Sequence, residues 1–223
     1  MRHPHASWFD PDKIIKDILW RDISYASRFA KGKLLDIGCG SKPYQSLFSK
    51  KINEYIGIDT YSPLADIKKD FFTAHIPSHT FDTILCTQVI EHVPDPNILL
   101  KKINTLLKKD GVLILTAPLV AALHEEPNDY YRFTKYALNN LLNHNGFTII
   151  TLKEEGDWIS SNLTMIAFYL EGTCNRYFLR FPKKLVIAFL MLFGTLLSHL
   201  PTQWTKPTKY PMNYLVIAKK KSA

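Results

Sequence analysis

Hydrophobic positions change their spacing in a regular way from residue 33 onward. Short continuous runs rich in Leu, Ile and Val alternate with longer stretches in which apolar residues recur every three or four positions. Continuous runs are typical of strands buried on both faces of a parallel sheet, and the longer spacing is typical of helices. The pattern therefore predicts an α/β protein with strands at residues 33–37, 54–58, 66–68, 81–87, 111–117, 147–153 and 213–218.

The same spacing predicts helices between these strands. Asp95 can cap a helix whose first residue is Pro96, and apolar residues then follow at helical spacing as far as Asp110: Leu99, Ile103, Leu106 and Leu107. Two further helices are expected at residues 17–31 and 134–145. Gly146 ends the second, because glycine adopts left-handed backbone at little cost.

Residues 154–210 interrupt this alternation, since they separate the last two predicted strands by far more than a turn requires. We interpret residues 1–223 as one domain, with a core at about 33–153 plus the strand 213–218 and a helical insertion between them. Residues 185–200 of the insertion carry no charged side chain, and four basic residues precede them: Arg176, Arg180, Lys183 and Lys184.

A helix over residues 185–200 would be about 24 Å long, which is less than the roughly 30 Å of a bilayer core. We expect it to lie in a membrane interface as a peripheral contact formed by residues 176–200. A buried helix that covers the sheet or forms a dimer interface is the alternative.

Composition narrows the class and the compartment. The chain is 46% hydrophobic with a formal net charge of +8, which is typical of a folded protein with an anionic partner such as nucleic acid, a membrane or a phosphorylated substrate. Cys39, Cys86 and Cys174 show no disulfide or zinc spacing, and the first twenty residues contain no secretory signal. A cytoplasmic protein is expected, in peripheral contact with the inner face of a membrane.

The strongest local motif follows the first predicted strand. Asp36, Gly38, Cys39 and Gly40 form an acidic strand end with two glycines in a tight turn, which allows a ligand to approach the backbone closely. Asp59 ends the next strand, about 20 residues after the first glycine, where an acid can accept both hydroxyls of a ribose. The third glycine of a dinucleotide site is missing after Gly40, which argues against NAD.

Together with Asp70, Phe81-Asp82, the segment from Gln88 to Val93 and the segment from Leu107 to Gly111, this motif resembles the class I S-adenosylmethionine (SAM) dependent methyltransferases of the small-molecule type 11 family. The resemblance covers roughly residues 33–147. It implies a Rossmann-like seven-stranded sheet in the order 3-2-1-4-5-7-6 with the last strand antiparallel, helices on both faces, and SAM as cofactor. It also implies a cofactor-binding set: Asp36, Gly38, Cys39, Gly40, Asp59, Thr60, Asp70, Phe71 and Gln88.

Within that set, the family assigns the glycine loop to the methionine part of SAM, Asp59 to the ribose, and Asp70 with Phe71 to the adenine edge. From the residues alone, Asp70 is equally compatible with an acid that only stabilises a turn.

The acceptor side is expected beyond the fourth and fifth strands. Residues 124–134 are dense in groups that move protons or hold anions, and they resemble a subset of the family associated in part with surface-polysaccharide or lipid-linked sugar synthesis. We assign His124 as the candidate base, because its unperturbed pKa lies near neutrality, and Tyr130 and Arg132 as residues that orient the acceptor. The alternative is that Glu126, Asp129 and Arg132 only pin a lid by ion pairs.

Two other interpretations compete with a small-molecule or lipid-linked O-methylation. Glu91, His92 and His124 match part of a divalent-ion site known in RNA and ubiquinone-pathway methyltransferases, but Gln88 replaces one carboxylate of the RNA enzymes, so no metal is expected. An RNA methyltransferase would suit the positive charge, although the clearest basic clusters flank the insertion or lie near residue 220, so nucleic acid is disfavoured as a partner. A non-catalytic SAM-binding scaffold is the third possibility.

Overall fold

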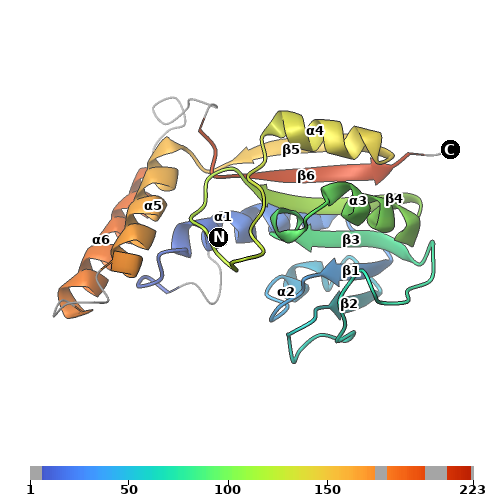
Figure 1. Ribbon diagram of the computed structural model, residues 1–223, viewed down its shortest axis with the longest axis horizontal. Coiled ribbons are helices and arrows are strands. Elements are labelled where there is room, and N and C mark those ends of the chain that lie inside the picture. The colour runs from blue at the N-terminus through green and yellow to red at the C-terminus, as the bar shows by residue number, and fades with distance from the viewer. Residues whose placement is uncertain (1–6, 174–179, 199–209, 222–223) are drawn as a thin grey trace. The chain divides into compact units, whose positions relative to one another are not determined.

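In this computed structural model the described residues are 7–173, 180–198 and 210–221. They contain a six-stranded sheet in the order β2-β1-β3-β4-β6-β5 (Figure 1). The strand bounds are β1 Lys33–Ile37, β2 Glu54–Ile58, β3 Phe81–Thr87, β4 Leu107–Pro118, β5 Phe147–Glu155 and β6 Asn213–Lys220. β1 pairs in parallel with β2 and β3, and β3 pairs in parallel with β4.

β6 runs against its neighbours. The backbone N–H of Met212, just before β6, donates to Glu155 at the end of β5, whereas Lys221, just after β6, donates to Gly146 before the start of β5. Leu119, which follows β4, also donates to Met212. The predicted Rossmann-like order with an antiparallel last strand is therefore confirmed, apart from its third strand.

The strand predicted at residues 66–68 is wrong. Only one bridge forms there, between Ile58 and Ile67. The segment leaves the sheet edge at once, because the residues that follow, Lys68, Lys69 and Asp70, are polar and lead into a turn instead of continuing an apolar run. Within the described residues the sheet thus has six strands where seven were expected.

The predicted helices are present with shifted ends. α1 spans Lys13–Ala26 and is followed by a 3-10 turn at Ser27–Phe29, while α4 spans Lys135–His144 with Thr134 as its N-cap. α3 spans Pro96–Leu106, and the Asp95 carboxylate caps it by accepting from Asn97. It ends before Asp110, because residues from Leu107 already pair with β3, with a register shift between Phe81 and Thr83. A short helix α2 at Gln45–Phe48 and a 3-10 turn at Ile90–His92 were not predicted.

The chain divides into two compact units. One comprises residues up to Asp22, residues 119–122 and the described part of 154–213, and the other comprises 23–118, 123–153 and the residues from Tyr214 onward. The second unit contains most of the sheet, whose central strands are fully buried, as Leu35, Ile84 and Ile114 illustrate. It also contains every residue of the predicted cofactor and acceptor sites.

The first unit is built on two helices, α5 at Trp158–Thr173 and α6 at Arg180–Ser198, which lie side by side (Figure 1). Gly194 allows close packing, since a Cβ there would lie 2.8 Å from Ile14 and 2.9 Å from Leu163. The unit has its own apolar core, formed by Ile14, Ile18, Ala167, Ile187, Met191 and Met212. No helix among the described residues is long and apolar enough to cross a membrane. Arg176, residues 199–200 and the side chains of Arg180 and Lys183 lie outside the described part of the chain.

Candidate active site

The glycine loop follows β1 and is held against the end of β2. Gly38 has φ +66° and Gly40 has φ +48°, conformations that favour glycine. The N–H groups of Gly38 and Cys39 donate to Ile58 of β2 at 2.9 and 3.3 Å. A Cβ on Gly38 would lie 2.6 Å from Val89, whereas a Cβ on Gly40 would meet no described atom within 4 Å. The loop is thus closed toward β3 and open at Gly40.

Asp36 lies under this loop, with its side chain buried beside β2. The Tyr55 hydroxyl donates to Asp36 Oδ2 at 2.5 Å, and Oδ1 has no hydrogen-bond partner among the described residues. Burial raises the pKa of Asp36 to about 7, and the bond from Tyr55 opposes that rise. Asp36 is therefore a buried carboxyl that retains accepting capacity for a ligand.

Asp59 connects the two turns that follow β1 and β2. Its Oδ2 accepts from the backbone N–H of Gly40 at 3.0 Å, and its Oδ1 accepts from Tyr61 at 2.8 Å and Ser62 at 2.9 Å. Desolvation raises the pKa of Asp59, but these three bonds outweigh it, and the pKa lies below its ordinary value. The carboxylate stays ionised near neutral pH, and Oδ2 keeps one lone pair for a further donor. Thr60 next to it is exposed.

Asp70 and Phe71 occupy the loop after the isolated bridge. Asp70 Oδ1 accepts from the backbone of Phe72 and Thr73, both at 3.0 Å, so the carboxylate does stabilise a turn. Phe71 is buried, and Lys102 of α3 donates to three backbone oxygens of this loop, on Phe71, Phe72 and Ala74. The position of the loop is therefore fixed by α3.

Glu91 marks the acceptor side, in the 3-10 turn after β3. Its side chain is fully buried, and neither carboxylate oxygen has a hydrogen-bond partner among the described residues. Desolvation raises the pKa of Glu91 to about 8, which Arg132 opposes. The backbone oxygen of Glu91 accepts from Tyr130 and Tyr131, which ties the 124–134 loop to the end of β3.

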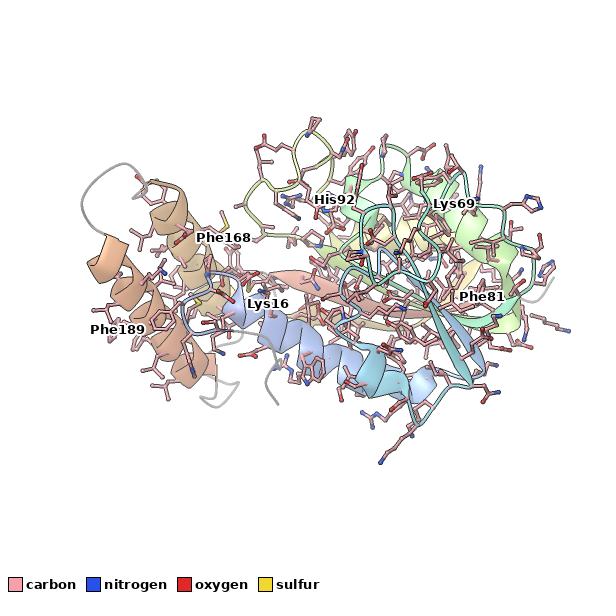
Figure 2. The ribbon with its side chains drawn as sticks, turned by 90° about the horizontal axis from the view of Figure 1, so that it is seen from below. Lys16, Lys69, Phe81, His92, Phe168 and Phe189 are labelled. Carbon is pink, nitrogen blue, oxygen red and sulfur yellow. The ribbon has the colours of Figure 1, made fainter. Side chains whose placement is uncertain are left out.

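Two histidines lie beside Glu91 (Figure 2 labels His92). His92 Nε2 is 3.9 Å from Glu91 Oε1, and the rings of His92 and His124 meet edge to face with centroids 4.8 Å apart. His92 Nδ1 lies 2.8 Å from the backbone oxygen of Asn128, and His124 Nδ1 lies 3.5 Å from Asp129 Oδ2. An acceptor at each Nδ1 favours a proton there and leaves the lone pair on Nε2.

Asp129 organises the acceptor loop. Its two oxygens accept from the two terminal nitrogens of Arg132, both at 2.7 Å, and Oδ2 also accepts from the backbone N–H of His124 at 3.0 Å. The bond from Arg132 holds the pKa of Asp129 well below its usual range. The predicted ion pair between Asp129 and Arg132 is present, while the Tyr130 hydroxyl, which is partly exposed, donates to the Asn128 side chain.

Glu91, His92 and His124 each bring a potential metal-ligand atom within 4.8 Å of the others. Gln88, whose identity argued against a metal, adopts φ +53° and donates its side-chain N–H to Thr116 Oγ1 at 3.0 Å. The unpartnered carboxylate of Glu91 and the Nε2 lone pairs form a donor set that fits a divalent cation. The residues therefore fit a metal that the sequence argument discounted.

A family model described as a methyltransferase domain matches residues 12–152, which is 141 of the 223 residues. The chain belongs to the methyltransferase-domain family. The predicted resemblance to SAM-dependent methyltransferases is thereby confirmed, and the match includes the glycine loop, Asp59, Glu91 and His124.

Two curated relatives of this methyltransferase-family chain are both named ubiquinone biosynthesis O-methyltransferase. The ubiquinone biosynthesis O-methyltransferase of Actinobacillus pleuropneumoniae serotype 7 (strain AP76) is 31% identical over 138 residues, covering 50% of this chain and 59% of the relative. That of Pasteurella multocida (strain Pm70) is 28% identical over 142 residues, covering 49% and 59%. The chain thus spans less than two thirds of the length of these relatives.

Solved structures show the same methyltransferase fold at low identity. The 1,6-didemethyltoxoflavin-N1-methyltransferase of Burkholderia thailandensis, solved with its substrate and S-adenosylhomocysteine, has a TM-score of 0.58 at 15% identity, covering 98% of this chain and 80% of that one. A SAM-dependent methyltransferase from Archaeoglobus fulgidus has a TM-score of 0.56 at 18% identity, covering 94% and 97%. The cyclase SpnF reaches 0.61 at 16% identity, covering 96% and 86%. Because a cyclase shares the fold, the fold alone does not decide the reaction.

Several residues that shape the methyltransferase site were missed in the sequence. Lys42 bonds Asp66 at 2.6 Å beside the glycine loop, and Asp66 also accepts from the backbone of Gly57 at 2.7 Å. The contact of Tyr55 with Asp36 had a readable signal: Gly57 lies opposite Asp36 in the parallel register, so Tyr55, two residues before Gly57, is on the same face of the sheet as Asp36. Lys102 had no such signal, because its partners are backbone oxygens.

Proposed function

We propose that this chain is an O-methyltransferase that uses SAM to methylate a small-molecule acceptor or one linked to a lipid or glycan. The observation that carries the proposal is the juxtaposition of two sites in one unit. A loop with the features of a SAM site contacts Val89, and two residues further along the chain the Glu91, His92 and His124 cluster begins. The names of the curated relatives support oxygen as the methylated atom.

The residues present fit SAM. Asp36 Oδ1 and the second lone pair of Asp59 Oδ2 are acceptors that the fold leaves for a ligand, and the open side of Gly40 allows close approach. We assign the methionine part to Asp36, Gly38, Cys39 and Gly40, the ribose to Asp59 and Thr60, the adenine to Asp70 and Phe71, and a supporting contact to Gln88. When bound, SAM supplies a methyl group on a positively charged sulfur.

The acceptor loop supplies proton transfer and orientation. His124, with 40% of its side chain exposed, accepts the proton of the acceptor hydroxyl at Nε2 while Asp129 stabilises the imidazolium at Nδ1. Arg132 directs two N–H groups to Asp129, so its main effect is to position His124. Tyr130 contributes a hydroxyl near the mouth of the loop. A divalent cation held by Glu91, His92 and His124 would be a second way to polarise the same hydroxyl.

We also propose a cytoplasmic site of action at the inner face of a membrane. Two observations support it: the thiols of Cys39 and Cys86 are free and buried, and the chain carries a net charge of +8. Cys174 lies outside the described residues. We further propose that the two compact units act as one methyltransferase, with α5 and α6 as an insertion of the predicted domain.

The proposal is tested first by cofactor binding and then by methyl transfer. Calorimetry should show one site for SAM and for S-adenosylhomocysteine, and the labelled methyl of SAM should appear in the lipid or small-molecule fraction of a cell extract. Folded protein that binds neither ligand would end the SAM proposal. Label in RNA would favour an RNA methyltransferase, whereas cofactor binding without transfer to any fraction would favour a scaffold.

A further inference from the structure

Helix α6 has apolar side chains on two faces, of which the structure covers one. Ile187, Met191 and Gly194 are buried in the core of the first unit. On the other side an uninterrupted stripe at spacings of four, three and four residues is exposed: Leu185, Phe189, Leu192 and Leu196. Phe189, labelled in Figure 2, is 64% exposed and stacks on Phe193, which is also exposed. Helix α6 thus presents an exposed apolar face opposite its buried one.

Helix α5 also has an exposed apolar face. Ser161, Thr164 and Ala167 are buried, whereas Trp158, Met165 and Tyr169 are exposed at spacings of seven and four residues, with Ile166 beside them. Tyr169 is 68% exposed. A soluble helix normally presents polar residues on its outer face. An apolar outer face on two adjacent helices marks an interaction surface.

Charge identifies the occupant of this surface. Residues 172–213 of the first unit contain no Asp or Glu and six basic residues: Arg176, Arg180, Lys183, Lys184, Lys206 and Lys209. Lys184 is exposed and directly precedes the apolar stripe of α6. A second copy of the chain would bring the same uncompensated positive charge to the interface, whereas an anionic lipid surface complements it.

We propose that α5 and α6 dock this chain on an anionic bilayer, with the exposed apolar faces among the acyl chains and the basic start of α6, where Lys184 is exposed, at the headgroups. The helices lie in the interface, since no described helix is long and apolar enough to cross a membrane. This inference deepens the proposed function by naming the surface on which a lipid-linked acceptor would be met.

The first test measures cosedimentation of the full chain with vesicles of phosphatidylcholine containing increasing phosphatidylglycerol. Binding should rise with the anionic fraction and fall in 1 M salt, where the Debye length is about 3 Å. Changing Lys183 and Lys184 to Glu should weaken binding by about 25-fold or more, because each lost lysine alone costs about fivefold. The matched control reverses the adjacent lysines Lys50 and Lys51, which are both exposed, and should bind nearly as the unmodified chain does.

The second test changes the apolar face. Phe189→Ser with Phe193→Ser should weaken vesicle binding by about tenfold or more, while Tyr136→Ser on α4, where Tyr136 is 75% exposed, should not. Equal vesicle affinity of all variants, or an unmodified chain that ignores vesicles, would overturn the docking proposal, as would a stable dimer that dissociates in the Phe variant. SAM binding measured on the same samples reports on the methyltransferase proposal separately.

Discussion

Asp59 beside the cofactor loop and Glu91 in the acceptor cluster differ in how their carboxylates are satisfied. Asp59 accepts three backbone N–H bonds from residues within twenty positions of it, so its geometry is set by local chain conformation. Glu91 is fully buried, whereas Asp59 is only partly buried, and the Glu91 carboxylate has no hydrogen-bond partner among the described residues. The Asp59 carboxylate is thus preorganised without a ligand, whereas the Glu91 carboxylate is completed by a proton, a cation or an acceptor.

The largest expected effect is on turnover, and it separates the acceptor site from the cofactor site. His124→Ala should lower turnover by about 10²–10⁴, because it removes the base or a metal ligand, and should leave SAM affinity nearly unchanged. His144→Ala on α4, an exposed histidine whose Nδ1 contacts Asn140, is the matched control. Steady-state kinetics with calorimetry measures both, and normal turnover in the His124 variant would remove it from the mechanism.

Activity measured in the presence of a chelator distinguishes the two roles proposed for His124, base and metal ligand. If the unmodified enzyme loses activity in chelator and Mg²⁺ or Mn²⁺ restores it, the Glu91, His92 and His124 cluster holds a cation. Full activity in chelator leaves His124 as a base.

The next effect is on the free energy of unfolding, and it concerns Asp36, the buried acid under the cofactor loop. Because the folded-state pKa of Asp36 is raised to about 7, its neutral form contributes stability that is complete below about pH 4 and is lost as pH rises through about 7. Asp36→Asn stays neutral throughout. Relative to this variant, the unmodified protein should lose up to about 4 kcal/mol of unfolding free energy between pH 4 and pH 8.

Urea unfolding across that range measures the difference. Tyr55→Phe provides a second check: it removes the hydrogen bond that lowers the pKa of Asp36, so the loss should move to higher pH. Parallel stability curves for the unmodified protein and Asp36→Asn would show that burial does not raise the pKa.

The smallest expected effect is on SAM affinity, and it concerns Asp59, the acid assigned to the ribose of SAM. Asp59→Asn places an amide where Oδ2 accepts from Gly40, and should weaken SAM binding by about 10- to 150-fold through loss of a charged acceptor. Asp82→Asn is the control, since Asp82 also accepts a backbone N–H, from Lys33, but lies at the start of β3. If the two variants bind SAM equally well, Asp59 does not contact the cofactor.

The contrast between local and long-range contacts also explains which features could be predicted from the sequence. The strands β1, β2 and β3 were predicted with their observed bounds, and the glycine loop follows from spacing, because backbone geometry is local. The early end of α3 and the single bridge at Ile67 were not predicted, because both depend on pairing with another segment of the chain. The unpartnered carboxylate of Glu91 arises from tertiary packing, which spacing does not encode.

β6 has a consequence for the order in which the molecule is assembled. It lies between β4 and β5, and 94 residues, 119–212, separate it from β4 along the chain. β5 stands at the edge of the sheet and has β6 as its neighbour, so it cannot join the sheet before β6 arrives. During synthesis the ribosome must therefore complete the α5 and α6 region before the sheet can close. A nascent chain halted at about residue 200 would expose one side of β4, and this is the state in which chaperone binding and aggregation compete with folding.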